Sequence, residues 1–156
     1  MKTRLMSSAF LTIDDELLLM HRAENRKVAP GMWSAVGGHL EPFEINEPKS
    51  ACLREIKEET GISAKIIKNL NLRYISVRNT GDEIRIHYIF FGELEFKAPM
   101  KECEEGTLHF VEVNKAIDLP MTFAMEYIIA NIKTTEPFTI FSDLLCVSRL
   151  GRQSHE

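Results

Sequence analysis

One segment constrains the fold of this chain more than any other: residues 37–62, which read GGHLEPFEINEPKSACLREIKEETGI. A glycine pair and a charged loop open the segment, and residues 47–60 then follow a helical pattern. Pro48 is tolerated in a first helical turn, and Gly61 is the residue type expected just after a last turn. The segment therefore predicts a shaped loop followed by one helix of about three turns.

Apolar runs on both sides of this segment predict β-hairpins. Runs rich in Leu, Ile, Val, Tyr and Phe, bounded by turn formers, occur at 5–13, 16–21, 64–77, 84–96 and 108–113. Asp14-Asp15 joins the first two runs and residues 79–82 join the next two; we expect 108–113 to be the partner strand of this second hairpin. Glycines and prolines interrupt residues 23–43, which we expect to form a long loop without a strand.

The C-terminal part holds a second helical pattern and one more apolar run. Residues 122–133 predict an amphipathic helix with Thr122 as its cap, and residues 137–147 predict a last strand. The chain of 156 residues fits one domain, expected to span 1–147, with 148–156 as a flexible tail. Because strands and helices mix without regular β-α-β alternation, the expected class is α+β or a mixed-sheet α/β sandwich.

Composition and charge exclude several classes of protein. With 44% hydrophobic and 27% charged residues, the chain is typical of globular domains rather than of disordered or fibrous proteins. The net charge of −4 disfavours a stable nucleic-acid partner, so a phosphate ligand would need a bound cation or a few placed Lys and Arg residues. We expect no membrane partner, because no apolar run is long enough to span a bilayer and no signal-peptide pattern is present.

Cys52, Cys103 and Cys146 form no C-x-x-C pair, which indicates reduced thiols, no structural zinc site and a cytoplasmic location.

Three carboxylates share one face of the predicted helix. At about 100° per residue, Glu55, Glu58 and Glu59 fall within an arc of roughly 100°. Such like charges repel one another unless a cation lies between them, and Mg²⁺ or Mn²⁺ prefers oxygen ligands and can bridge to phosphate. A solvated acidic helix face is the alternative interpretation. A site is favoured by Glu44, a further acid on the loop, and by the glycine pair, where a backbone can approach a ligand closely.

At these residues the chain resembles a known family. Gly38-x5-Glu44, followed by Arg54 to Ile62 (REIKEETGI, with Gly61 near its end), is similar to the Nudix box, G-x5-E-x7-R-E-U-x-E-E-x-G-U, where U is apolar. The resemblance implies a Nudix-type α/β/α sandwich with a mixed β-sheet, in which the box forms a loop–helix–loop motif. It also implies Mg²⁺- or Mn²⁺-dependent hydrolysis of a nucleoside diphosphate linked to another moiety, X.

The resemblance further implies roles for individual residues of the box. By position, Glu58 and Glu59 correspond to metal ligands, and the Gly37 carbonyl corresponds to a further ligand. Arg54 corresponds to a structural partner of a box glutamate. Glu55 corresponds to a position that serves as ligand or general base, depending on the family member.

The chain departs from the family pattern in two places. Nine residues, not seven, separate Glu44 from Arg54, which leaves the role of Glu44 open and makes Glu47 a candidate to replace it. Phe43 stands where the family commonly has glycine, and a positive φ there would strain it.

Candidate residues outside the box are less specific. In some family members the general base lies on a loop before a late strand, where this chain has Glu104 and Glu105; an exposed acidic turn is the alternative. Trp33 resembles a position that packs under the box, and we favour a core role over base stacking. Four basic residues are candidates to bind substrate: Arg22, Arg26, Lys27 and Arg85. Three polar residues of the long hairpin are more typical of a sheet surface: Arg73, Arg78 and His87.

Two sequence markers of particular substrates in this family are absent, which narrows the expected substrate class. Val77 stands about sixteen residues beyond Gly61, where the ADP-ribose pattern has proline, and no coenzyme A signature precedes Gly37. A nucleoside triphosphate or modified nucleotide, such as an 8-oxo-dGTP-like molecule, is the leading expectation, with a dinucleoside polyphosphate as an alternative. A nucleotide-sensing domain also stays open, whereas Cys52 and Cys103 give little support to an isopentenyl diphosphate isomerase. A homodimer formed through the strand at 84–96 stays open as well.

Overall fold

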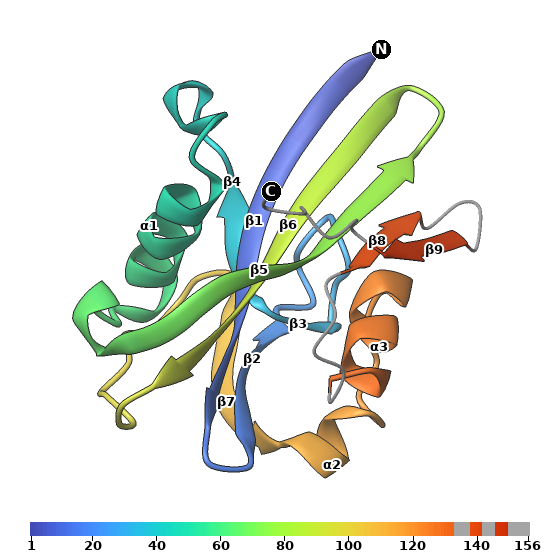
Figure 1. Cartoon of the computed structure of the whole chain (residues 1–156). Coiled ribbons are helices and arrows are strands. Elements are labelled where there is room, and N and C mark those ends of the chain that lie inside the picture. Colours follow the sequence, from blue (N-terminus) through green and yellow to red (C-terminus); the bar gives the residue numbers. More distant parts are fainter. Residues whose placement is uncertain (133–137, 142–145, 150–156) are drawn as a thin grey trace, which may run out of the picture.

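The computed structural model describes residues 1–132, 138–141 and 146–149. Figure 1 shows a mixed sheet with helix α1 on one side and helix α3 on the other. In chain order the elements are β1 (Lys2–Ile13), β2 (Glu16–Arg22), β3 (Trp33–Ser34), β4 (Val36–His39), the 3₁₀ helix η1 (Pro42–Glu44), α1 (Pro48–Thr60), the 3₁₀ helix η2 (Ala64–Ile66), β5 (Ile67–Asn79), β6 (Glu83–Leu94), β7 (Gly106–Glu112), α2 (Val113–Ala116), α3 (Phe123–Ala130), β8 (Phe138–Phe141) and β9 (Cys146–Arg149). This arrangement confirms the predicted class of a mixed sheet with few helices.

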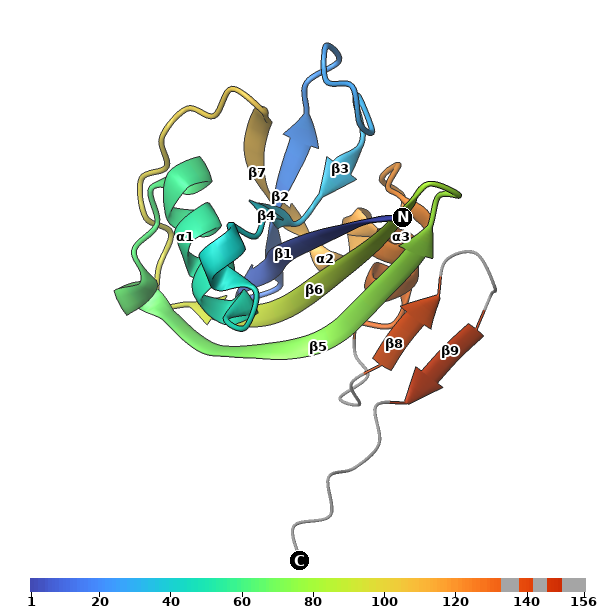
Figure 2. The same cartoon turned by 90° about the horizontal axis from the view of Figure 1, so that it is seen from above.

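Strand β1 organises the sheet. The strand order is β3-β2-β1-β6-β5-β8-β9, with β4 paired to β1 and β7 paired to β2. β1 is antiparallel to β2 and β4 but parallel to β6, which makes the sheet mixed. Figure 2 shows that β5 and β6 are bent along their length, and register shifts in β5 occur between Lys68 and Asn71 and between Leu72 and Tyr74. Such irregularities increase local twist and bend a strand.

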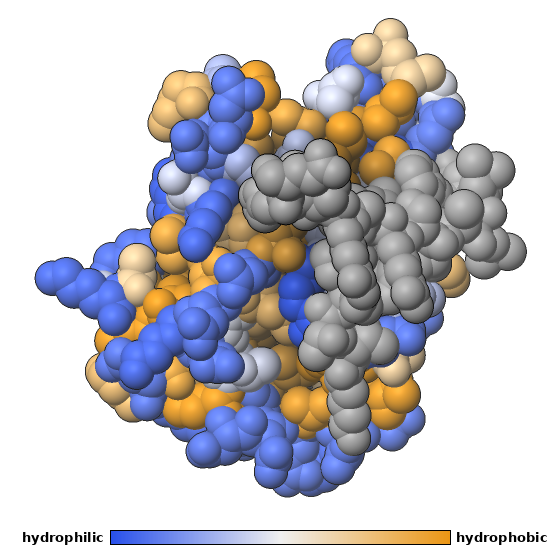
Figure 3. All heavy atoms as spheres, viewed as in Figure 1, coloured by the Kyte–Doolittle hydropathy of each residue, from blue (hydrophilic) through white to orange (hydrophobic). Residues whose placement is uncertain are grey.

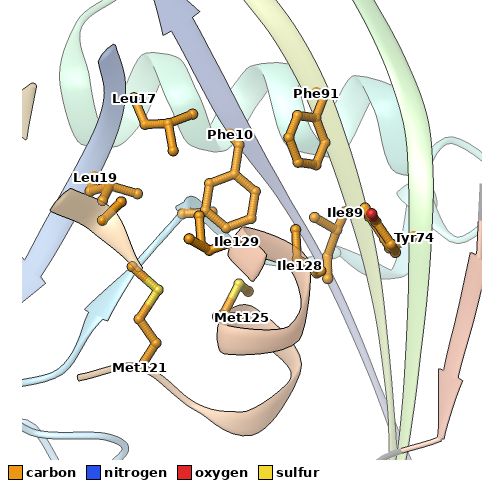
Figure 4. Packing of buried hydrophobic residues seen from close by; sticks show 12 residues of the cluster. Phe10, Leu17, Leu19, Tyr74, Ile89, Phe91, Met121, Met125, Ile128 and Ile129 are labelled. Carbon is orange, nitrogen blue, oxygen red and sulfur yellow. The ribbon is translucent and has the colours of Figure 1, made fainter. Parts of the chain in front are cut away.

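The two faces of β1 bury separate cores because side chains alternate along a strand. Phe10 packs on one face with Phe91 and with the α3 residues Met125 and Ile128 (Figure 4). Ala9 and Leu11 pack on the other face with α1, through residues that include Ile56. The sheet therefore has a helix on each side, each with its own apolar contact surface.

Helix α1 has the predicted ends. Pro48 stands in its first turn, and Gly61 adopts φ 78° just after Thr60, where its N–H donates to the Lys57 carbonyl at 3.0 Å. This left-handed cap costs little for glycine, which has no Cβ. The predicted hairpins β1–β2 and β5–β6 are confirmed as antiparallel pairs. Thr122 precedes α3 at its N-cap position, as predicted, but its side chain makes no capping hydrogen bond.

Three expectations about strands were wrong. The stretch 23–43 is not a continuous loop, because it contains β3 and β4, and β4 pairs with β1 from Met6 to Ala9. β7 pairs with β2 rather than with the second hairpin, whose β5 edge is parallel to β8 instead. Where one last strand was expected, β8 and β9 form an antiparallel pair. A local apolar pattern identifies a strand but carries no information on a distant partner.

The structure describes only the first two residues of the predicted tail, 148–156. β9 runs to Arg149, two residues beyond the predicted limit at 147, whereas residues 150–156 lie outside the described residues. None of the helices in the described ranges has both the length and the apolar character needed to cross a membrane.

The face shown in Figure 3 carries hydrophilic residues interspersed with apolar patches.

Candidate active site

The glycine pair lets strand β4 lie very close to both β1 and α1. A Cβ atom on Gly37 would lie 2.2 Å from the Ser7 carbonyl oxygen, and one on Gly38 would lie 2.6 Å from the Glu55 carboxylate carbon. A side chain on Gly37 would therefore push β4 away from β1, whereas one on Gly38 would meet the end of the Glu55 side chain, which can move. The Gly37 N–H donates to Glu59 Oε2 at 3.0 Å, so the backbone of β4 directly contacts a carboxylate of the helix.

The register shows which way the Gly37 backbone faces. Leu40 N–H donates to the Leu5 carbonyl at 3.0 Å, and alternate residues of an antiparallel strand face the same way. Gly38 thus faces β1, whereas the N–H and C=O of Gly37 face away from it. Because the Gly37 N–H already meets Glu59, its carbonyl oxygen is on the same side as that carboxylate and could serve as a metal ligand.

Arg54 joins the loop to the helix through a network of hydrogen bonds. Its Nε donates to Glu44 Oε1 at 2.7 Å and its Nη2 donates to Glu44 Oε2 at 2.9 Å, a bidentate pair. Its Nη1 donates to Glu55 at 2.9 Å and to Glu58 at 3.0 Å, and Nη2 also donates to the His39 carbonyl at 3.0 Å. These hydrogen bonds to Arg54 hold the pKa of Glu44 down at about 2.

The departures in the loop have structural explanations. Glu44, not Glu47, pairs with Arg54, since Glu47 is exposed immediately before α1. The longer loop forms η1, whose Glu44 carboxylate also accepts the Glu41 N–H at 2.9 Å. Phe43 lies in η1, is absent from the positive-φ residues of the described chain, and is 81% exposed. The strain considered for Phe43 therefore does not occur.

The three helix carboxylates differ in their surroundings. Burial raises the pKa of Glu59 to about 8, and the nearby Glu105 carboxylate adds to that shift. Burial also raises the pKa of Glu55, although its hydrogen bond to Arg54 opposes the rise. Glu58 has a side chain that is 58% exposed and does not line the adjacent cleft. The predicted acidic face therefore consists of two half-buried or buried acids and one exposed acid.

A cleft of about 640 Å³ opens beside Glu55 and Glu59. It contains all four basic residues predicted to bind substrate: Arg22, Arg26, Lys27 and Arg85. Glu105 also lines the cleft and pairs with Arg26 at 3.1 Å and Arg22 at 3.9 Å, whereas Glu104 is exposed. The geometry thus favours Glu105 over Glu104 as the candidate general base of that turn.

Sequence reasoning missed six residues that line the cleft: Arg4, Met6, Asn25, Val28, His39 and Glu41. Arg4 lies near the start of the chain and joins the cleft only because β1 pairs in parallel with β6. His39 follows the glycine pair, and its ring lies 3.4 Å from the Arg4 guanidinium. The position of His39 inside the box, between Gly38 and Glu44, was a signal that the sequence offered; Arg4 had none.

Four other residues lie away from the cleft. Arg73 stacks over the Phe91 ring at 4.4 Å, and Arg78 is exposed on β5. His87 shares a 2.6 Å hydrogen bond with the Ser8 hydroxyl, and burial lowers its pKa to about 4. Trp33 packs against the core cluster next to α3 and stacks on His21 at 4.6 Å. A core role for Trp33 is confirmed, but it does not lie under the box helix.

The oxygen donors on one wall of the cleft suit a hard divalent cation. Glu55, Glu59 and the Gly37 carbonyl could supply ligands, and burial raises the pKa values of both carboxyl groups. Within the described part of the chain, no three His, Cys, Asp or Glu side chains already converge on one point. Side-chain movement would therefore accompany ion binding.

Comparison with known proteins identifies relatives. The family model described as NUDIX domain matches residues 2–132. The nucleoside triphosphatase NudI of Salmonella typhimurium is 37% identical over 86 residues, and that of Salmonella agona is 35% identical over 86 residues. Each match covers 55% of this chain and 55% of the relative, so the chain spans about half the length of these curated relatives.

Solved structures share the fold at lower identity. A MutT protein from Bacillus halodurans matches with a TM-score of 0.72 and 23% identity, covering 94% of this chain and 97% of that one. An Ap4A hydrolase from C. elegans matches with a TM-score of 0.66 and 16% identity, covering 85% of this chain and 95% of that one. At these identities the likeness concerns the fold.

Proposed function

The chain belongs to the NUDIX domain family, and from this premise we propose that it is a Mg²⁺- or Mn²⁺-dependent pyrophosphohydrolase. Its proposed substrate is a nucleoside triphosphate or another nucleoside diphosphate derivative. The observation that carries the proposal is the cleft, which combines the acids Glu55, Glu59 and Glu105 with basic side chains. An ion held by the acids would neutralise part of a polyphosphate, and the basic residues would bind the rest of its charge.

Three carboxylates and one carbonyl are the proposed ligands. Glu59 and the Gly37 carbonyl face the same side of β4, and Glu55 lies against Gly38. Glu58 is held by Arg54 alone among the described residues, so its exposed carboxylate can turn toward an ion that competes with that guanidinium. When bound, the ion supplies charge neutralisation and lowers the pKa of a water molecule that attacks phosphorus.

The chain's own residues would orient the reaction. Arg54 fixes Glu55 through the 2.9 Å hydrogen bond and is itself anchored by Glu44, so we assign Arg54 a positioning role. Glu55 and Glu105 both line the cleft and are the two candidates for the general base. Arg22, at the end of β2, and Arg26 and Lys27, on the segment after it, would bind phosphate oxygens.

The similarity to NudI supports a nucleoside triphosphate as the substrate class. An oxidised nucleotide such as 8-oxo-dGTP belongs to this class, and its removal would make the protein a nucleotide-pool sanitiser. We also propose a cytoplasmic location, because Cys52 and Cys103 are free thiols in the structure.

The test is hydrolysis of a substrate panel with Mg²⁺ or Mn²⁺, with the products resolved. The panel holds standard and oxidised nucleoside triphosphates, a dinucleoside polyphosphate, ADP-ribose and a nucleotide sugar. Metal-dependent cleavage of a triphosphate that a chelator abolishes is the expected result. If nothing is cleaved while nucleotides still raise the melting temperature, the protein is a nucleotide-sensing domain and the proposal is wrong.

A further inference from the structure

Two arginines held by one glutamate line the cleft away from its carboxylates. Arg4 and Arg85 are direct partners in the parallel pair of β1 and β6, and both line the cleft. Glu83 has a side chain that is only 11% exposed. Its Oε2 accepts from Arg4 Nε at 3.2 Å, and its Oε1 accepts from Arg85 Nε at 2.5 Å. One buried carboxylate thus fixes two guanidinium groups side by side.

Arg85 keeps donors free for a ligand. Within the described residues, its Nη1 and Nη2 have no hydrogen-bond partner, whereas Nε is occupied by Glu83. The Arg4 guanidinium, by contrast, also lies 3.4 Å from the His39 ring. A guanidinium anchored at Nε presents its two terminal N–H groups as a planar fork, which suits two adjacent acceptors.

Arg4 and Arg85 lie some distance along β1 from the part of the cleft that is proposed to bind phosphate. Gly37 is the partner of Ser8 on β1, and Arg4 lies four residues before Ser8. At about 3.3 Å per residue, Arg4 and the Ser8–Gly37 pair are therefore roughly 13 Å apart along the strand. With phosphates at Gly37 and Glu59, this separation is comparable to the reach across a ribose to the far edge of a nucleobase. Met6 lines the cleft between them and offers an apolar surface for that ring.

The charge at this end favours a neutral ring edge over another phosphate. Glu83 neutralises one of the two guanidinium charges and uses both of its oxygens. Arg22, Arg26 and Lys27 lie elsewhere on the cleft wall and remain available for phosphate. What Arg85 presents is therefore a directional pair of donors rather than a concentrated positive charge.

We propose that Arg85, positioned by Glu83, selects a nucleobase with two adjacent hydrogen-bond acceptors on one edge. This inference rests on the proposed function. The acceptor pair is N7 and O6 of guanine or N3 and O2 of cytosine. Adenine places the N6 donor beside N7, and thymine places the N3–H donor between its two carbonyls, so each would set a donor against the fork. 8-Oxoguanine carries a proton on N7 and would lose one of the two bonds.

The experiment measures kcat/KM for dGTP, dCTP, dATP, dTTP and 8-oxo-dGTP. In the wild type, dGTP or dCTP should exceed dATP and dTTP by about tenfold or more, and the favoured base tells the two acceptor edges apart. Arg85→Gln and Arg85→Lys should reduce this ratio to below about threefold, mainly through KM of the favoured nucleotide, because neither side chain supplies a planar fork. Glu83→Gln should give an intermediate ratio.

Arg78→Gln is the matched control, because Arg78 is the partner of Arg85 on β5 but is exposed and does not line the cleft. Its base ratios should equal those of the wild type. Arg85→Lys keeps the charge beside Glu83, so it remains informative if Arg85→Gln fails to fold; melting temperatures identify that case.

Two results would overturn the inference: a wild type that hydrolyses all four bases equally, or an Arg85→Lys loss that is equal for all of them. The second result would identify Arg85 as a phosphate contact. A wild type that cleaves neither these five nucleotides nor any other compound of the substrate panel refutes the proposed function instead. In that case the melting temperature is measured with each of the five nucleotides. Equal shifts for all of them would overturn the role of Arg85.

Discussion

Glu44 and Glu59 belong to the same loop and helix and are buried almost equally, at 5% and 8% exposure. Their pKa values nevertheless move in opposite directions, to about 2 for Glu44 and about 8 for Glu59. Glu44 accepts two hydrogen bonds from the Arg54 guanidinium, whereas Glu59 accepts one from a backbone N–H and lies near Glu105. Equal exposure therefore does not give the two carboxyl groups equal pKa values; the bidentate pairing of Glu44 with Arg54 accounts for the difference.

The comparison separates a structural region from a reactive one. Around Arg54 the charges are already compensated, so that region holds the loop against the helix. Around Gly37, burial and the nearby Glu105 raise the pKa of Glu59, so its ionised form is costly there and would be stabilised by a bound cation. Three experiments test this division.

Substitution of the reactive carboxylates should have the largest effect. Glu59→Gln is expected to lower kcat by about 10³-fold, because a ligand with fixed geometry is lost and several kcal/mol of charge stabilisation go with it. Glu58→Gln should lower kcat less, by about 10²-fold, because water can replace an exposed ligand. Steady-state hydrolysis at saturating Mg²⁺ measures both. Glu47→Gln, an exposed acid just before α1, serves as the control and should keep wild-type activity; near-normal turnover by Glu59→Gln would contradict the assignment.

Removal of Arg54 should break the structural region. Arg54→Met leaves the buried Glu44 carboxylate without its cation, so the melting temperature should fall by roughly 5–10 °C. The double variant Arg54→Met/Glu44→Gln should recover part of that loss, because no buried charge is left unpaired. Thermal unfolding of the two single variants and the double variant measures this coupling. Strictly additive losses would show that Glu44 and Arg54 do not act as a pair.

The pH dependence of metal binding should give the smallest of the three effects. Glu59 has a folded pKa of about 8, above its ordinary value of 4.5, so without an ion its ionisation destabilises the fold progressively as pH rises from about 4.5 to 8. Mg²⁺ requires the ionised form, so its stabilisation should grow over the same window. The rise in melting temperature on adding Mg²⁺ should be larger at pH 8.5 than at pH 6. Glu59→Gln should remove this difference, and a chelator should reverse the wild-type shift; a pH-independent shift would place the ion elsewhere.

Local patterns in the sequence predicted the reactive helix well. The proline and glycine at the ends of α1 and the spacing of its acids depend on neighbouring residues only, so they could be interpreted without a structure. The same holds for the β1–β2 and β5–β6 hairpins, whose turns lie between their strands. The basic residues at 22–27 reach the cleft because they lie at the end of β2 and directly after it.

Long-range pairing accounts for what could not be predicted. β4 is formed because its glycines fit against Ser7 and Ser8, and no local pattern reports that fit. The placement of Arg4 beside Arg85 depends on a parallel pairing between residues 81 positions apart. The choice of Glu44 over Glu47 depended on how the longer loop folds, which the spacing alone left open.

The absence of a side chain at Gly37 has a consequence for how such a protein can change. A Cβ atom there would lie 2.2 Å from the Ser7 carbonyl oxygen, so the spacing between β4 and β1 depends on a bare backbone. The wall that carries the acids is therefore intolerant of a side chain at this position. The end of the cleft at Arg4 and Arg85 is built by side chains on β1 and β6 rather than by a close backbone contact. A substitution there can therefore change base selectivity without displacing strand β4.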